Sequence, residues 1–347
     1  MSQPGRQRFW VAGATGFLGS HLLRALIERG DDIVAVSRNG GISAGFDVTP
    51  LNVLDSEAVA QSARGCDGAF LVTGKVSRAK DAGEELHKAH VTATRSALKG
   101  LKQAGVRRVV VASTSGTLAV GKDPDRVFDE HDQAPLELLA SWPYYRSKLY
   151  AEHAALEANS PPDFEVVLVN PSLLLGPGDL RESSTRDVRQ FLEQSILAVP
   201  RGGIAFVDVR DAALGMLAAF ERGRAGERYI LNAKNLTIAA FFQRLERLTG
   251  VKGPRLFLPR SRPLALGLNK LYSNALRKLG GEPPVSEESV EMGQYYWYCS
   301  AKKAERELEW VAREPGETLR DTVQDLVLRK VAFPKQPLKF TQGSSAS

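Results

Sequence analysis

The sequence predicts an α/β fold in which a doubly wound parallel sheet is followed by a smaller, mostly helical region. Three observations predict it. Short apolar segments alternate with amphipathic helical segments through the first half of the chain, which is the order of a sheet with helices on both faces. The apolar segments are continuous runs, as in parallel strands buried on both faces. The first run leads directly into a glycine-rich turn and a helix, so the chain opens with a βαβ unit.

The predicted strands and helices alternate in order along this first part. Apolar and β-branched runs predict strands at 9–11, 33–36, 69–72, 108–112 and 166–170. Apolar residues at helical spacing predict helices at 20–29, 86–104 and 144–159. Gly30 and Gly105 follow the first two of these helices, and glycine commonly ends a helix. We therefore expect residues 7–173 to form a Rossmann-type domain.

The alternation loosens after Pro171. A turn at 176–178 precedes further predicted elements, which are a helix at 186–198, a strand at 204–207, a helix at 211–222 and a strand at 229–231. From residue 237 helices dominate, and the last two are predicted at 300–308 and 316–329.

These elements divide the chain into two regions and a tail. Residues 204–232 are expected to complete the Rossmann-type domain. Residues 174–203 and 233–331 are expected to form a substrate-binding region over the carboxyl ends of the strands. Residues 332–347 end in a polar, serine-rich segment and are expected to be disordered.

Composition excludes several classes of partner. The chain has 347 residues, 43% hydrophobic and 25% charged, as in ordinary globular proteins. Its net charge of +6 comes from Lys and Arg without a dense cluster, so no nucleic-acid partner is expected. No leader segment or apolar stretch long enough to span a membrane is present, so a soluble protein is expected.

The spacing of the cysteines and histidines matches neither a disulfide framework nor a metal-binding motif. Cys66 and Cys299 are the only cysteines and form no framework, which predicts a reduced, cytoplasmic protein. His87 and His90 lie three residues apart on a predicted helix, but nothing nearby completes a zinc ligand set. We therefore expect no metal site.

The glycine-rich turn predicts a dinucleotide site. Gly13, Gly16 and Gly19 follow the first strand and precede the first helix. Glycines so placed allow a tight turn, a close approach of the backbone to a pyrophosphate, and close packing of the helix on the sheet. The helix N-terminus adds free N–H groups and a partial positive charge. The context makes this a strong indication, whereas the glycine spacing alone would be weak.

The end of the second strand indicates which dinucleotide is bound. Enzymes that use NAD usually carry Asp or Glu there, bonded to the ribose hydroxyls. This chain carries Ser37 and Arg38, and a guanidinium binds a 2′-phosphate through two parallel hydrogen bonds. The sequence therefore favours NADP(H) over NAD. The alternative is that Arg38 is only a solvated residue at the end of a strand.

A proton-transfer pair is predicted on the helix at 144–159. Tyr144 and Lys148 are four residues apart and share one face of that helix. A nearby ammonium lowers the pKa of a tyrosine and lets it exchange a proton with a carbonyl or carbinol oxygen. Tyr-x-x-x-Lys is common by chance, but here it lies downstream of the dinucleotide turn. The hydroxyls of Ser113, Thr114 and Ser115 also follow the valine-rich strand, where the carboxyl ends of strands meet the cofactor cleft.

From these motifs the chain resembles an extended short-chain dehydrogenase/reductase of the NAD-dependent epimerase/dehydratase family. The resemblance runs from about residue 9 to residue 331. It implies catalytic roles for Tyr144, Lys148 and Thr114, with Ser113 and Ser115 as rivals for the hydroxyl. The first Asp of the family's Asp-x-x-Asp segment is Asn52 here. The implied cofactor-binding residues are Gly13, Thr15, Gly16, Phe17, Leu18, Gly19, Arg38, Asn52, Val53, Val72, Thr73, Gly74, Tyr144, Lys148, Pro171 and Ser172.

Two subgroups of this family compete. The Ser37–Arg38 pair and the segments at 206–211 and 226–231 resemble reductases similar to dihydroflavonol 4-reductase, and equally their bacterial relatives labelled hopanoid-associated sugar epimerases. Nucleotide-sugar enzymes usually carry Arg-Asp-Tyr/Phe before the strand at 204–207, where the arginine holds the substrate diphosphate. Apolar residues occupy 204–206 here, although Arg201 lies close by.

The leading hypothesis is an NADP(H)-dependent oxidoreductase that reduces a ketone or aldehyde, or runs the reverse reaction. The second is a nucleotide-sugar epimerase or dehydratase with bound NAD(P), and the third is a non-catalytic dinucleotide sensor. The small-molecule substrate and the direction of reaction stay open. The resemblance implies a homodimer formed through the helices at 86–104 and 144–159.

Overall fold

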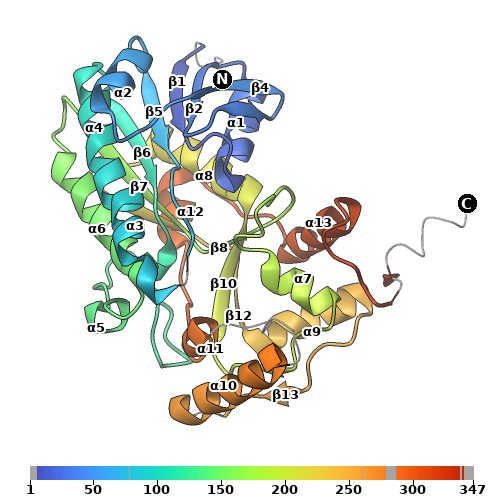
Figure 1. Cartoon of the computed structure of the whole chain (residues 1–347). Coiled ribbons are helices and arrows are strands. Elements are labelled where there is room, and N and C mark those ends of the chain that lie inside the picture. The colour runs from blue at the N-terminus through green and yellow to red at the C-terminus, as the bar shows by residue number, and fades with distance from the viewer. Residues whose placement is uncertain (1–5, 78, 260, 279–286, 337, 340–347) are drawn as a thin grey trace, which may run out of the picture.

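An eight-stranded sheet forms the upper part of the molecule in the computed structural model, which describes residues 6–77, 79–259, 261–278, 287–336 and 338–339 (Figure 1). Its strand order is β11-β7-β6-β5-β1-β2-β4-β3. All neighbours are parallel except β3 and β4. The strands are β1 (Arg8–Ala12), β2 (Asp32–Ser37), β3 (Gly41–Ser43), β4 (Phe46–Pro50), β5 (Gly68–Leu71), β6 (Arg108–Ala112), β7 (Glu165–Pro171) and β11 (Arg228–Leu231). The predicted doubly wound sheet is confirmed.

Helices cover both faces of this sheet. One face carries α2 (Ser56–Ser62), α4 (Ala93–Gln103) and α6 (Pro143–Ala158), and the other carries α1 (Phe17–Arg29), α8 (Val209–Arg222) and α12 (Lys302–Leu308). Strand β1 shows why both faces are filled. Phe9 and Val11 belong to one hydrophobic core, Trp10 and Ala12 belong to the other, and all four are fully buried. Such a strand reads as a continuous apolar run because successive side chains point to opposite faces.

The helix predicted at 86–104 begins earlier than expected, and residues 80–103 form four successive helical segments. They are η1 (Lys80–Ala82), α3 (Gly83–His87), the π-helical turn η2 (Lys88–Thr92) and α4. A π-helical turn inserts a residue into the α-helical repeat and is frequent at functional sites. His90 lies within this turn and is buried.

A three-stranded sheet of order β12-β10-β8 lies below the large one. Its strands are β8 (Leu173–Leu175), β10 (Gly203–Asp208) and β12 (Lys234–Thr237). Within residues 204–232, which were expected to complete the Rossmann-type domain, β10 belongs to this small sheet and not to the large one. Strand β11, in register with β7 from Arg228 to Leu231, occupies the edge position instead. The β3–β4 hairpin also escaped prediction, because its strands are short and largely polar.

The lower region contains helices around this small sheet. They are α7 (Arg186–Leu192), α9 (Ile238–Thr249), α10 (Arg262–Lys278), α11 (Glu287–Met292) and α13 (Pro315–Leu328), with the short strand pair β9 (Ala198–Val199) and β13 (Leu256–Phe257). The helix predicted at 186–198 stops at Leu192, and Gln194 adopts a left-handed backbone conformation with φ of 52°. No helix within the described part of the chain is long and apolar enough to cross a membrane.

The predicted disordered tail is partly ordered. Leu338 is 4% exposed and joins the core formed by α7, α9 and α13. The expectation of disorder from residue 332 is therefore wrong for Leu338, because this apolar side chain finds a buried site. Residues 340–347 lie outside the described residues.

Candidate active site

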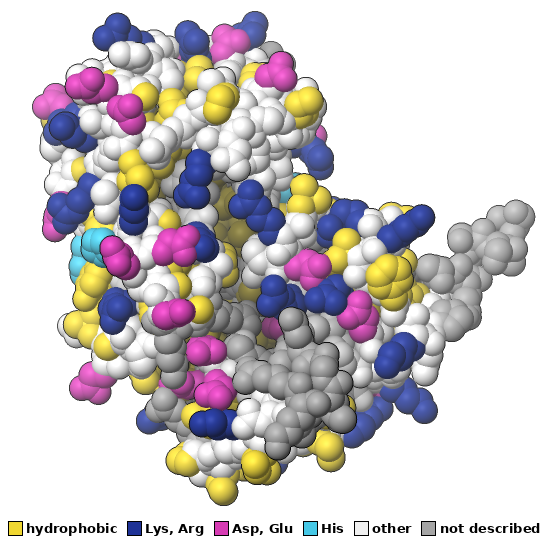
Figure 2. Space-filling model, in the orientation of Figure 1, with side chains coloured by type: hydrophobic (Ala, Val, Ile, Leu, Met, Phe, Trp, Pro, Cys, Tyr) yellow, Lys and Arg dark blue, Asp and Glu magenta, His cyan; other side chains and the backbone are white. Residues whose placement is uncertain are grey.

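A large cleft separates the carboxyl ends of the main strands from the lower region. Its volume is about 2280 Å³, and residues of both regions line it. Figure 2 shows the hollow between the two parts, with hydrophobic side chains in its depth and Lys and Arg side chains around its rim. The cleft crosses the ends of β1 and β5, where the order in which strands are added to the sheet reverses. Ligands of doubly wound folds bind at this position.

The glycine turn forms one wall of the cleft. Gly13 has φ of +85°, and a Cβ built on it would lie 2.7 Å from the carbonyl oxygen of Val72. A Cβ on Gly19 would lie 2.1 Å from the carbonyl oxygen of Gly13. Any side chain at either position would collide with backbone, so the turn and the helix packing both require glycine. Gly16 is the N-cap of α1, whose first N–H groups have no partner within the helix. This cradle fits a diphosphate.

Most predicted cofactor residues meet in this cleft. Gly19 is the exception, because it packs α1 against the turn and does not line the cleft. Those that line it are Gly13, Thr15, Gly16, Phe17, Leu18, Arg38, Asn52, Val53, Val72, Thr73, Gly74, Tyr144, Lys148, Pro171 and Ser172.

The end of β2 is free of carboxylates. Arg38 follows the strand directly, is exposed, lines the cleft, and has no hydrogen bond or ion pair with any described residue. Asp55, the second acidic position of the family segment, accepts hydrogen bonds from the N–H groups of Glu57 (3.1 Å) and Ala58 (3.0 Å). It caps α2 and does not line the cleft, whereas Asn52 does.

Helix α6 brings the predicted pair into the same cleft. Tyr144 is half-buried and lines the cleft in its first turn, and Lys148 follows one turn later. The Lys148 ammonium is buried and donates a hydrogen bond to the carbonyl oxygen of Ala112 at the end of β6 (3.1 Å). Burial lowers the pKa of Lys148 to about 8, although the nearby Glu152 acts to raise it. The lysine is thus fixed between the strand end and the tyrosine helix.

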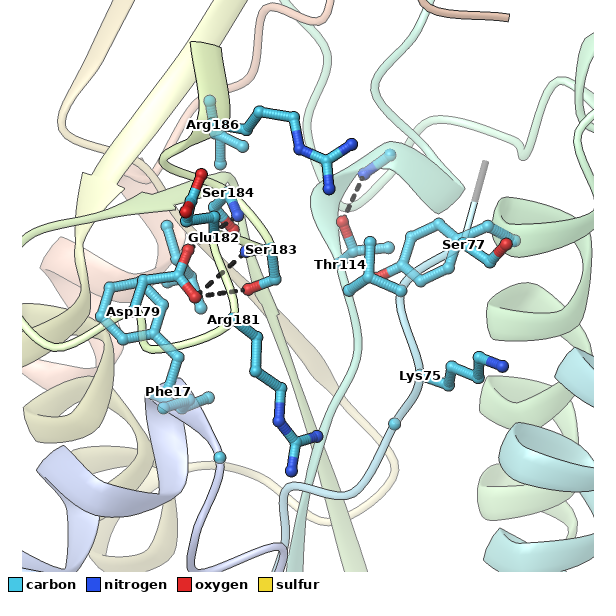
Figure 3. A pocket seen from close by; sticks show the side chains of 18 of the residues that line it. Phe17, Lys75, Ser77, Thr114, Asp179, Arg181, Glu182, Ser183, Ser184 and Arg186 are labelled. Atoms are coloured by element: carbon cyan, nitrogen blue, oxygen red, sulfur yellow. Dashed lines mark hydrogen bonds between the residues drawn. The ribbon is translucent and has the colours of Figure 1, made fainter. Parts of the chain in front are cut away.

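The three candidate hydroxyls occupy different surroundings. Ser113 and Ser115 line the cleft as Thr114 does, but the hydroxyl of Ser113 donates a hydrogen bond to Glu152. Ser115 is buried and hydrogen-bonded to the thiol of Cys299, whose pKa burial raises to about 12. Thr114 lines the cleft, and its Oγ1 accepts a weak hydrogen bond from the N–H of Gly116 (3.4 Å), so its proton stays available to a ligand (Figure 3).

A buried carboxylate behind these hydroxyls was not predicted. Glu152 is 1% exposed, and its Oε1 accepts hydrogen bonds from Thr117 (2.7 Å), Asn170 (2.7 Å) and Ser113. Asn170 also donates to the carbonyl oxygen of Thr114 (3.0 Å). The carboxylate therefore ties the ends of β6 and β7 together beneath Thr114. Its spacing, four residues after Lys148, was the sequence signal that could have revealed it.

His90 is the second residue that sequence reasoning missed. Its Nε2 accepts a hydrogen bond from the N–H of Lys75 (3.1 Å), so its Nδ1 carries the proton and donates to the hydroxyl of Ser147 (2.8 Å). That hydroxyl donates to the carbonyl oxygen of Tyr144 (2.8 Å). Burial, with a contribution from Lys148, lowers the pKa of His90 to about 3, so the ring is neutral. His90 thereby links the loop after β5 to the tyrosine helix. The described residues contain no cluster of three metal-ligating side chains.

Apolar and aromatic side chains also line the cleft. The ring of Tyr145 packs against Trp297, with centroids 4.8 Å apart, and Trp297 in turn packs against Trp142 (5.4 Å). Ile204 and Ala205 line the cleft where nucleotide-sugar enzymes would place an arginine. The nearby Arg201 stacks on Phe257 at 5.0 Å and donates to the carbonyl oxygen of Leu258 (3.2 Å).

Sequence and structure comparisons relate the chain to known proteins. The sequence profile of the NAD dependent epimerase/dehydratase family matches residues 9–232. A protein named "Putative dihydroflavonol 4-reductase" from Synechocystis sp. is 32% identical over 324 residues, covering 91% of this chain and 93% of that protein. A 4-hydroxy-2-methyl-3-oxo-4-farnesyl-3,4-dihydroquinoline-1-oxide ketoreductase from Stigmatella aurantiaca is 32% identical over 262 residues, covering 71% and 74%. The crystal structure of gox2253 matches with a TM-score of 0.80 and 25% identity, covering 94% of this chain and 100% of that chain.

Proposed function

Because the chain belongs to the NAD dependent epimerase/dehydratase family, we propose that it is an NADP(H)-dependent reductase that converts a ketone or aldehyde into an alcohol, or runs the reverse reaction. The family resemblance and the named reductases among the relatives make the chain an oxidoreductase that uses a nicotinamide dinucleotide. The proposal adds the preference for NADP(H), the carbonyl reaction and the residues that carry it.

The residues of the cleft suit a dinucleotide. The glycine cradle and the start of α1 would hold its diphosphate, and Arg38 would bind a 2′-phosphate. Asn52 and Val53 would lie beside the adenine, and the loop at 72–74, Pro171 and Ser172 would line the nicotinamide end. When bound, the cofactor supplies or accepts the hydride that changes the carbonyl carbon.

The chain's own residues would manage the proton and the oxygen. In the reductive direction the Tyr144 hydroxyl donates its proton to the substrate oxygen. The Lys148 ammonium would stabilise the phenolate that this leaves. The Thr114 hydroxyl donates a hydrogen bond to the same oxygen and holds it beside the tyrosine.

One observation carries this proposal: Tyr144, Lys148 and Thr114 line the same cleft as the glycine cradle and the unpaired Arg38. The test is to follow NADPH oxidation with a panel of aliphatic and aromatic aldehydes and ketones. We expect turnover with apolar members, because the aromatic side chains of Trp142, Tyr145 and Trp297 line the cleft. Turnover of UDP- or TDP-sugars without added cofactor would favour the epimerase or dehydratase alternative. Tight cofactor binding with no turnover at all would favour a dinucleotide sensor.

The Arg38→Ala variant should lose the preference for NADP(H). A charge-assisted, bidentate contact to phosphate contributes about 1.5–3 kcal/mol, so the Kd for NADPH should rise roughly ten- to a hundredfold. The Kd for NADH should stay within about twofold, because NADH has no 2′-phosphate. Calorimetric titration with both cofactors measures this. A wild-type protein that binds NADH more tightly than NADPH would overturn the role given to Arg38.

The oligomeric state of the protein and its cellular compartment stay predictions. We propose a cytoplasmic homodimer that buries the outer faces of the helices at 86–104 and 144–159. Sedimentation velocity of the purified protein would give its mass in solution.

A further inference from the structure

A short loop overhangs the glycine cradle from the lower region. It spans residues 177–185, between β8 and α7, and it is organised by one buried carboxylate. Asp179 is 1% exposed and accepts hydrogen bonds from the N–H groups of Ser183 (3.1 Å), Ser184 (2.8 Å) and Thr185 (3.1 Å). The hydroxyls of Ser183 and Thr185 donate two more hydrogen bonds to the same carboxylate. The loop is therefore shaped by its own contacts before any ligand binds.

The base of this loop is attached to the helix that begins at the cradle. His21, in the second turn of α1, hydrogen-bonds through Nε2 to the carbonyl oxygen of Pro177 (2.8 Å). Its ring packs edge-on against Phe17, the first residue of α1, with centroids 6.0 Å apart. His21 is 7% exposed, and burial lowers its pKa, so the contact persists with a neutral ring. The loop is thus held beside the phosphate end of the cleft.

Arg181 extends from this loop into the cleft. Figure 3 shows its guanidinium in the space between Phe17 and the segment that carries Lys75. Arg181 is exposed and, within the part of the chain that the structure describes, has no hydrogen bond or ion pair. The adjacent carboxylate of Glu182 is bound to Arg189 (2.5 Å), so it does not neutralise Arg181.

The cradle itself supplies no positive side chain. From Gly13 to Leu23 the chain has no lysine or arginine, and Arg24, which also lines the cleft, comes only in the second half of α1. The turn and the first residues of α1 therefore offer N–H groups and a helix dipole. A diphosphate held there would keep its outer oxygens facing the loop. A planar guanidinium matches two such oxygens at once.

We propose that Arg181 is a cofactor-binding residue whose guanidinium binds the diphosphate of the dinucleotide, opposite the glycine cradle. The proposal rests on the proposed dinucleotide site, but not on the reaction or on the choice between NADP(H) and NAD(H). It divides recognition between two arginines: Arg38 at the 2′-phosphate and Arg181 at the diphosphate.

ADP-ribose is the probe that isolates this contact, because it has the diphosphate but neither the nicotinamide nor a 2′-phosphate. Calorimetry would compare ADP-ribose, NADPH, NADH and adenosine on the wild type, R181A, R181K and R186A. R186A is the matched control, since Arg186 directly follows this loop as the first residue of α7. It is exposed, has no partner among the described residues, and points toward Thr114 in Figure 3.

We expect R181A to weaken ADP-ribose, NADPH and NADH by a similar factor of roughly ten or more, with R181K intermediate and adenosine unaffected. R186A should leave the affinity for ADP-ribose within about twofold. Added salt should weaken the wild type more than R181A. Equal losses in R181A and R186A would show a general charge effect and overturn the contact, as would a loss confined to NADPH. Failure of the reductase proposal would instead appear as absent turnover with these affinities unchanged.

Discussion

The Tyr144→Phe variant should lose about a hundred- to ten-thousandfold in kcat for carbonyl reduction, because proton transfer by a positioned side chain contributes that much. Phenylalanine keeps the ring and its edge-to-face packing with His90, where the centroids lie 5.6 Å apart. Only the hydroxyl is removed. The affinity for NADPH should therefore change by no more than a few-fold. Initial rates of NADPH oxidation with a turned-over aldehyde or ketone measure the first effect, and calorimetry measures the second.

The matched control is Tyr150→Phe on the same helix. Tyr150 is 45% exposed and does not line the cleft, so its hydroxyl should be dispensable. Unchanged activity in the Tyr144→Phe variant would remove the catalytic assignment. Equal losses in both variants would point to damage to α6 as a whole.

The Lys148→Met variant should lose activity while the apo protein becomes more stable at pH 7. Burial lowers the pKa of Lys148 from 10.5 to about 8. Below pH 8 the lysine is charged in both the folded and unfolded states, and the folded state carries the full penalty of the buried charge. A shift of this size corresponds to roughly 3 kcal/mol, of which the lost hydrogen bond to Ala112 offsets about 1. Denaturant unfolding at pH 7 should show a free energy of unfolding raised by about 2 kcal/mol.

The difference in stability between the Lys148→Met variant and the wild type should depend on pH. Between pH 8 and 10.5 the folded protein releases the proton while the unfolded chain keeps it, so the wild type gains stability and the advantage of the variant fades. Over the same range the wild-type kcat/KM for reduction should fall above about pH 8, as Lys148 loses the charge that supports Tyr144.

The control for the Lys148→Met variant is Lys303→Met, which removes a buried lysine that has an ion-pair partner. Lys303 is 7% exposed and paired with Glu227 at 2.6 Å, so its loss should destabilise the protein at pH 7. A Lys148→Met protein that is less stable than the wild type at pH 7 would contradict the burial argument.

Local patterns were sufficient for most of the large sheet. Strands β1, β2, β5, β6 and β7 are apolar runs that can be recognised without knowing their neighbours. Strand β10 has the same character, yet it pairs with β8 and β12 in another sheet. Its membership depends on which strand occupies the edge beside β7, and that is a long-range choice that no window of sequence contains. The β3–β4 hairpin and the early end of α7 were missed because short polar strands and single left-handed residues have little local signal.

The candidate active site also has a part that the sequence predicts and a part that it does not. The glycine cradle, Arg38, Tyr144 and Lys148 could be named from the sequence, because each depends on spacing within one turn or one helix. The different surroundings of Ser113, Thr114 and Ser115 could not be predicted, since Glu152 and Cys299, which bind the hydroxyls of Ser113 and Ser115, lie far from them in the sequence.

The sequence by itself determined that this chain has a Rossmann-type sheet, a dinucleotide turn and a tyrosine–lysine pair, because local spacing and side-chain type are enough for each. Only the tertiary structure decided which groups surround that pair. His90 reaches α6 from another helix, and Arg181 reaches the glycine cradle from a loop more than 160 residues later in the chain. Burial also lowered the pKa values of Lys148 and His90. These properties arise from contacts between distant segments and from exclusion of water, and neither is recorded in the order of neighbouring residues.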